Sequence, residues 1–145
     1  MNSRINIQAL EPAAYQAMFG LEKYLGTTDL DPKLKELTKI RASQINGCAY
    51  CIQMHAAEAR KQGETEQRIY ALAAWRESPL FSDQERAVLA LTDEVSMISE
   101  RGLSDTTYEA ALKALGENGL AQCIMQIVVI NAWNRMAVST HMHHG

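Results

Sequence analysis

Two cysteines and a histidine recur at positions 48, 51 and 55, within the segment Cys-Ala-Tyr-Cys-Ile-Gln-Met-His. On a helix of about 3.6 residues per turn these positions share one face, so Cys48, Cys51 and His55 form a stripe. Cys48 falls in the first turn, where free backbone N–H groups and the positive end of the helix dipole favour a thiolate. The His55 side chain leans back toward the N-terminus and can reach the Cys51 sulfur, whereas Cys48 is roughly 10 Å away along the axis. The spacing therefore indicates Cys51 as the thiol with a base and Cys48 as its dipole-stabilised partner.

A carboxylate that could orient the imidazole is available in two places. The cysteines follow Asn46-Gly47, a short turn that predicts an antiparallel hairpin of two helices. Folding about this turn brings Glu36 level with roughly residues 55 to 58, so its carboxylate can approach His55 directly or through a water molecule. Glu58, three residues after His55 and near the same face, is the rival. Either carboxylate would raise the basicity of the imidazole and complete a set of nucleophile, base and orienting group, and the spacing leaves the choice open.

Composition and charge restrict the class of protein. The chain has 145 residues, enough for one domain with its own core, which we place at residues 1–145. The chain has 14 Lys and Arg residues and 17 Asp and Glu residues, which gives a net charge of -3. The charged residues form no long runs of one sign, which argues against a nucleic-acid partner. The N-terminus lacks the apolar core of a signal peptide, and the most apolar stretch, residues 123–132, is too short to span a membrane. We therefore expect a soluble cytoplasmic protein, in which a CxxC pair indicates redox or metal chemistry rather than a structural disulfide.

Apolar residues recur with helical spacing along the whole chain, and no stretch alternates with the period of a strand. The sequence thus predicts an all-α, single-domain bundle of about six to seven helices, with the CxxC motif at the N-terminus of a central helix. This excludes a thioredoxin fold, which needs βαβ units. The expected helices run from Pro12 to Gly26, from Pro32 to Asn46, from Cys48 to Gln62, from Thr65 to Trp75, from Ser82 to about Gly102, from Ser104 to Gly116 and from about Glu117 to Ser139.

Most other residues that could do chemistry are expected to be structural. Cys123 has no partner motif, and we assign it to core packing. Buried amides and guanidinium groups need partners, so Asn131, Asn134 and Arg135 are expected to bond neighbouring helices or a second subunit. Four aromatic residues have core-like spacings: Tyr15, Tyr50, Trp75 and Trp133. The remaining histidines lie in a polar tail expected to be a frayed terminus: His141, His143 and His144.

Glu36, eleven intervening residues, Cys48-Ala49-Tyr50-Cys51 and His55 together resemble the carboxymuconolactone decarboxylase-like superfamily. Within it, the pattern is similar to the alkyl hydroperoxidase D (AhpD) type. The segments FSDQERAVLALTDEVS and INAWNRMAV also resemble sequences of that superfamily, so the resemblance covers roughly residues 13–138. It implies an all-helical fold that assembles into trimers or hexamers, and a thiol peroxidase activity.

The resemblance also implies roles for individual residues. In the AhpD pattern the second cysteine attacks the peroxide, the first resolves the sulfenic acid into a disulfide, and a Glu and a His form a proton relay. Carried over, Cys51 is peroxidatic, Cys48 is resolving, and Glu36 and His55 are the relay. The resemblance thereby selects Glu36 over Glu58.

The chain departs from the AhpD pattern between the cysteines, where Tyr50 replaces a second histidine and could donate its hydroxyl into the site. It also looks like a single motif-bearing unit, shorter than the two-repeat peroxidase. The decarboxylase branch lacks the CxxC motif, which makes decarboxylation the poorer interpretation.

The predicted function is a hydroperoxide-reducing thiol enzyme without cofactor or metal, regenerated by a dithiol or thioredoxin-like reductant and assembled as a homo-oligomer. One alternative is a general thiol–disulfide oxidoreductase. Another is a zinc site formed by Cys48, Cys51, His55 and one carboxylate, although donors spread along one straight helix fit a compact tetrahedron poorly. A third is a non-catalytic helical oligomer whose cysteines are incidental.

Overall fold

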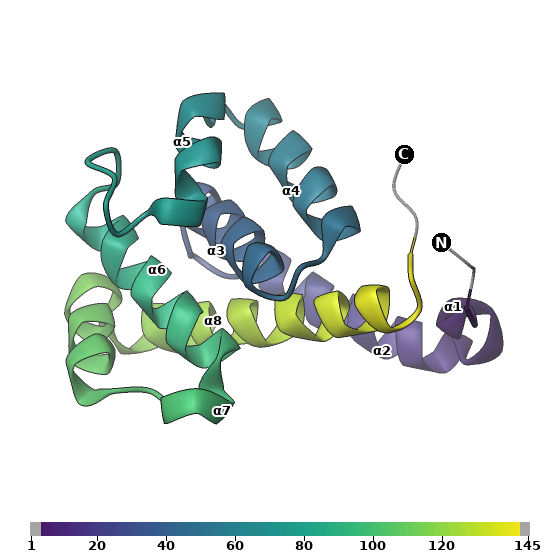
Figure 1. Cartoon of the computed structure of the whole chain (residues 1–145). Helices are drawn as coiled ribbons and strands as arrows, with labels where there is room; N and C mark the ends of the chain where they lie inside the picture. The colour runs from purple at the N-terminus through teal and green to yellow at the C-terminus, as the bar shows by residue number, and fades with distance from the viewer. Residues whose placement is uncertain (1–3, 143–145) are drawn as a thin grey trace.

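The computed structural model describes residues 4–142 and contains helices and their connections, with no strand among these residues (Figure 1). The all-α prediction is therefore confirmed. Met1 to Ser3 of the N-terminal segment, and His143 and His144 of the predicted tail, lie outside the described residues. In chain order the helices are α1 (Ile7–Leu10), α2 (Pro12–Gly26), α3 (Pro32–Ile45), α4 (Ala49–Lys61), α5 (Glu66–Ala71), the 3₁₀ helix η1 (Leu72–Ala74), α6 (Asp83–Ser96), α7 (Ile98–Arg101) and α8 (Asp105–Ser139).

Helix α8 forms the centre of the fold and packs against α3 and α6 (Figure 1). Its apolar residues meet those of α3 and α6 in one buried cluster that includes Leu34, Val88, Leu91 and Ile127. Helix α8 is kinked at Gly116, whose backbone is not helical, with φ 74 and ψ 173. Only glycine adopts this conformation readily, so the break predicted at Gly116 is present as a kink between two helical segments.

Helices α3 and α4 form the predicted antiparallel hairpin, and a second buried cluster joins them to α5, η1 and α6. Leu37 and Ile40 of α3 contribute to this cluster, together with Ala59 of α4 and Leu89 of α6. Each helix buries the apolar side of its helical repeat here. The hairpin is therefore held firmly at the level where Glu36 and His55 face each other.

Local capping explains several helix boundaries. Ser82 and Glu85 form the expected capping box, with the Glu85 N–H donating to Ser82 Oγ at 3.2 Å and the Ser82 N–H donating to Glu85 Oε1 at 2.8 Å. Two features differ from the prediction. The short helix α1 was not expected, and the helix expected from Ser82 to Gly102 is interrupted at Met97, whose φ of -105 and ψ of 39 are not helical.

Helices α1 and α2 lie at one end of the molecule, beside the C-terminal half of α8 (Figure 1). Leu25 is the one residue of α2 that is fully buried, so most of this helix lies outside the two core clusters. We call α1 and α2 the N-terminal arm. Within residues 4–142, no helix combines the length and apolar character needed to cross a membrane.

Candidate active site

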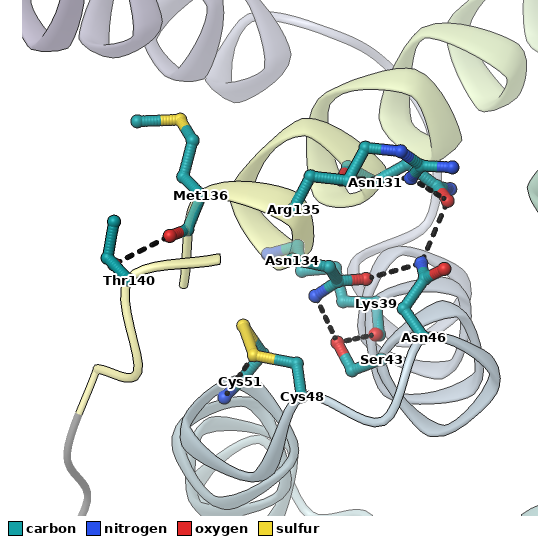
Figure 2. Close-up of a disulfide and its surroundings, with 10 residues drawn as sticks. All are labelled: Lys39, Ser43, Asn46, Cys48, Cys51, Asn131, Asn134, Arg135, Met136 and Thr140. Atoms are coloured by element: carbon teal, nitrogen blue, oxygen red, sulfur yellow. Dashed lines mark hydrogen bonds between the residues drawn. A yellow bond between two sulfur atoms is a disulfide. The ribbon is translucent and has the colours of Figure 1, made fainter. Parts of the chain in front are cut away.

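The two cysteines lie where α4 begins, and they are joined by a disulfide (Figure 2). Cys48 was expected in the first turn of this helix, but it is the N-cap of α4, one position earlier. Its Sγ accepts a hydrogen bond from the Cys51 N–H at 3.2 Å. The backbone N–H of Cys48 donates to the Ser43 carbonyl at 2.9 Å, which fixes the entry of the chain into α4. Both cysteines are only 2% exposed and pack against Ala137 near the end of α8.

A chain of amide hydrogen bonds ties this helix start to α8 (Figure 2). Asn46 Nδ2 donates to Asn131 Oδ1 at 2.9 Å and to Asn134 Oδ1 at 3.0 Å. Asn134 Nδ2 in turn donates to Ser43 Oγ at 3.0 Å, and Arg135 Nη1 donates to Asn131 Oδ1 at 2.9 Å. Residues at the end of α3 thus bond Asn131 and Asn134, as the sequence predicted. Arg135 differs from the prediction, because it is exposed and bonds Asn131 of its own helix. Ser43 had not been singled out, because its partner lies 91 positions away in the chain.

The structure brings Glu36 of α3 close to His55 of α4. Glu36 Oε2 lies 3.8 Å from His55 Nδ1, and neither of these buried atoms has a hydrogen-bond partner. The other carboxylate oxygen, Oε1, accepts a hydrogen bond from Lys39 Nζ at 3.1 Å. A shift of about 1 Å would close the gap to a hydrogen bond. Glu58, the rival acid, is exposed and pairs with Lys61 at 3.4 Å.

Burial lowers the pKa of His55 from 6.5 to about 4, with the positive charge of Lys39 acting in the same direction and Glu58 opposing it. At neutral pH the imidazole is therefore uncharged and can accept a proton. Because Nδ1 faces the Glu36 carboxylate, the favoured tautomer has its proton on Nδ1 and its lone pair on Nε2. The arrangement provides a base at Nε2 of His55, while the second ring nitrogen, Nδ1, faces the Glu36 carboxylate.

A cavity of about 390 Å³ opens beside the disulfide, between the N-terminal arm, α4 and the end of α8. Cys51 and His55 both line this cavity, whereas Cys48 does not. The sulfur of Cys51 is therefore the one that a small molecule in the cavity would meet. The other residues lining the cavity are Gln8, Tyr15, Phe19, Glu22, Tyr50, Met54, Trp133, Ala137 and Met142.

Sequence reasoning missed most of the residues that line the cavity. Tyr15 and Trp133 had been assigned core-like spacings, but they are half-buried and line the cavity. Tyr50 lines it too, in line with the expectation that its hydroxyl could enter the site. Trp75 is a core residue, at 3% exposure. Their helical spacing does not distinguish a core from a cavity wall. One sequence signal pointed to a cavity wall: the helix from Pro12 to Gly26 carries more aromatic residues than a small contact with the core requires.

The other reactive groups do not converge on a second centre. Among the described residues, no three His, Cys, Asp or Glu side chains are grouped so that they could hold a metal ion. Cys123 is a free thiol buried in the core, and its burial raises its pKa to about 12. It has the packing role expected from the sequence.

Comparisons with known proteins identify a matching family model, a relative of similar length and solved structures with the same fold. The model of the carboxymuconolactone decarboxylase family matches residues 12–94. The uncharacterized protein YdfG of Bacillus subtilis is 37% identical over 139 residues, which cover 96% of this chain and 95% of YdfG. A crystal structure of an Agrobacterium tumefaciens protein of unknown function, considered a candidate antioxidant defence protein AhpD, is 38% identical, with a TM-score of 0.96 and 99% of both chains covered. The debrominase Bmp8, only 19% identical, shares the fold with a TM-score of 0.83, covering 95% of this chain and 74% of its own.

Proposed function

This chain belongs to the carboxymuconolactone decarboxylase family, and we propose that it is an AhpD-like thiol peroxidase that reduces hydroperoxides through Cys51 and Cys48. The observation that carries the proposal is the placement of Cys51. Its sulfur is within bonding distance of a second cysteine, it borders a cavity, and it shares that cavity with an uncharged buried histidine. The similarity to the Agrobacterium protein, a candidate antioxidant defence protein AhpD, supports the proposal.

The first step is loss of the Cys51 proton. A free thiol has a pKa of about 8.5, so only a few per cent is thiolate at neutral pH unless the site lowers that pKa. Cys51 lies in the first turn of α4, where the helix dipole favours negative charge. His55 accepts the proton at Nε2, and Glu36 closes on Nδ1 to stabilise the imidazolium that forms.

The next steps return that proton and form the disulfide. The Cys51 thiolate attacks the terminal oxygen of the hydroperoxide, the O–O bond breaks, and the products are a Cys51 sulfenic acid and an alkoxide that takes the proton from His55. The Cys48 thiol then attacks the sulfenic sulfur, an S–S bond forms, and water leaves. An external dithiol reduces the disulfide and becomes oxidised itself. In this proposed cycle the Cys48–Cys51 disulfide is the oxidised form of the enzyme.

Replacing the proposed nucleophile tests the assignment directly. Cys51→Ser should abolish peroxide consumption, whereas Cys48→Ser should consume one equivalent and stop, because the sulfenic acid has no resolving partner. Peroxide loss, thiol titration and intact mass, which would show one added oxygen on Cys51, provide the measurements. Cys123→Ser is the matched control and should keep normal turnover, since Cys123 lies in the core. Normal turnover in Cys51→Ser would refute the proposal.

Burial also distinguishes this function from a general thiol–disulfide oxidoreductase. Both cysteine residues are 2% exposed, which hinders attack by a bulky protein disulfide, whereas a small peroxide can reach Cys51 through the cavity. We expect rapid oxidation of the dithiol form by small hydroperoxides and slow reduction of protein disulfides. The reverse order of rates would favour the oxidoreductase alternative.

Homo-oligomer formation is a further part of the proposal. Large apolar side chains are exposed on both α2 and α8, among them Tyr24, Tyr108, Val128 and Val138. Exposed apolar side chains of this size favour contacts with a second copy of the chain. Light scattering after gel filtration should give a trimer or a hexamer, and a monomer at micromolar concentration would contradict this part alone.

A further inference from the structure

Three aromatic rings form one wall of the cavity. Tyr15 and Phe19 lie one turn apart on α2, and Trp133 meets them from α8. The Tyr15 and Trp133 ring centroids are 5.4 Å apart at an interplanar angle of 69°, and those of Phe19 and Trp133 are 6.0 Å apart at 38°. Phe19 is nevertheless 44% exposed. Rings that contact each other but keep a face open to a cavity of small-molecule size are typical of a binding site for an apolar ligand.

One charged group faces the same cavity. Glu22, one turn beyond Phe19, accepts a hydrogen bond from Trp133 Nε1 at 2.9 Å. This bond holds the indole ring against the arm and keeps the carboxylate beside the cavity. Among the described residues that line the cavity, none is Lys or Arg. In the disulfide form His55 does not supply a positive charge either, because its pKa is about 4.

The reacting groups and the aromatic wall contact different parts of one ligand. Cys51 and His55 must meet the O–OH group, so the remainder of the substrate extends toward Tyr15, Phe19 and Trp133. An aromatic group there would gain ring contacts without losing hydrogen bonds to water. A carboxylate there would lose its hydration and lie near Glu22 with no compensating cation.

We propose that this cavity is a substrate site for neutral aromatic hydroperoxides, and that Glu22 is the residue that disfavours anionic ones. This specificity rests on the proposed peroxidase function for its chemistry. The binding preference itself does not depend on turnover, so it can be measured separately.

The first experiment measures binding to the intact oxidised protein with an unreactive pair of probes, cumyl alcohol and its para-carboxylate. Trp133 lines the cavity and Trp75 is buried elsewhere, so tryptophan fluorescence reports occupancy. Cumyl alcohol should quench it saturably and bind about tenfold more tightly than the carboxylate. Glu22→Gln, which keeps an acceptor for Trp133, should remove most of that difference. Glu11→Gln removes a charge from the same arm outside the cavity and should preserve it.

The second experiment measures kcat/KM for cumene hydroperoxide, its para-carboxylate and hydrogen peroxide. The wild type should prefer the neutral aromatic substrate, and Glu22→Gln should reduce its preference over the carboxylate about tenfold. Phe19→Ala should lower kcat/KM for cumene hydroperoxide about tenfold more than for hydrogen peroxide, because only the larger substrate reaches the rings.

The two experiments fail in different ways. Equal binding of the two probes, or a preference that survives in Glu22→Gln, would overturn the role of Glu22. Selective binding of cumyl alcohol without turnover of any hydroperoxide would refute the peroxidase function and leave the ligand preference standing.

Discussion

Glu36 and Asp93 are both carboxylates buried among the core helices, at 6% and 4% exposure, but their surroundings differ. Asp93 Oδ1 accepts a hydrogen bond from Arg41 Nε at 2.7 Å, and its Oδ2 accepts one from Trp75 Nε1 at 3.1 Å. Glu36 has a partner at one oxygen only, Lys39, and its second oxygen faces the unpartnered Nδ1 of His55. One acid is satisfied, and the other is not.

This difference separates a structural carboxylate from one that can act. A buried polar group without a partner costs about 1–3 kcal/mol, so selection for stability alone favours the arrangement around Asp93. Around Glu36, two unpartnered atoms lie 3.8 Å apart, and each is the natural partner of the other once a proton moves. The unsatisfied pair is therefore the one expected to respond to chemistry at Cys51.

The largest expected effect comes from breaking the satisfied acid. Asp93→Asn leaves the mostly buried guanidinium of Arg41 without its counter-charge, and should lower the free energy of unfolding by about 3–5 kcal/mol. Turnover per folded molecule should not change, because Asp93 is not part of the site. Urea unfolding measures the loss. Arg76→Met, which removes an exposed partner of Asp93, should cost less than about 1 kcal/mol and serves as the control.

The second-largest effect is a pH dependence of the free energy of unfolding, which arises from His55 in its unsatisfied pair with Glu36. The pKa of His55 is about 4 in the folded protein and 6.5 in the unfolded chain. Above pH 6.5 both forms are neutral; as the pH falls from 6.5 to 4 only the unfolded chain binds the proton, so stability falls by up to about 3 kcal/mol. His55→Gln should remove this component. Urea unfolding of the disulfide-bonded proteins at pH 7 and near pH 4 checks it, and equal pH dependence in both would contradict it.

Glu36→Gln should lower kcat/KM for the hydroperoxide about a hundredfold, because the imidazolium loses its stabilising carboxylate. Its unfolding free energy should fall by less than that of Asp93→Asn, because Glu36 bonds only Lys39, three residues away on the same helix, whereas Asp93 joins Arg41 and Trp75 across the core. The comparison between the two acids fails if both substitutions act mainly on stability. Glu58→Gln removes the rival acid from the surface and should leave turnover within about threefold of the wild type.

The smallest effect concerns Lys39, which holds Oε1 of Glu36 and lowers the pKa of His55. Lys39→Met should raise the pKa of His55 and lower turnover about tenfold, since the carboxylate is less firmly placed. NMR titration of the His55 imidazole measures the first change, which a merely structural role would not produce. Lys39→Arg should restore most of both properties, and an unchanged His55 titration in Lys39→Met would exclude the role.

Features that depend on neighbours in the chain could be predicted. The capping box at Ser82 and Glu85 fixes the start of α6, and the kink at Gly116 lies where glycine was expected to end a helix. The shared face of Cys51 and His55 follows from helical periodicity alone. The interruption at Met97 was not predicted, because neither glycine nor proline lies near it and the serine before it also fits a continuous helix.

Features that depend on packing could not be predicted. Glu36 and Asp93 both occur in amphipathic helical segments, and nothing in the adjacent residues tells which one keeps a free oxygen. The cavity depends on even longer connections, because Trp133 contacts Glu22 from 111 positions away. The sequence alone determined a helical hairpin carrying two thiols and an imidazole, because these elements are fixed by contacts within a few turns. The family resemblance selected Glu36, but only the tertiary structure decided that this acid lies beside the imidazole and what faces Cys51, because both depend on how separate helices pack.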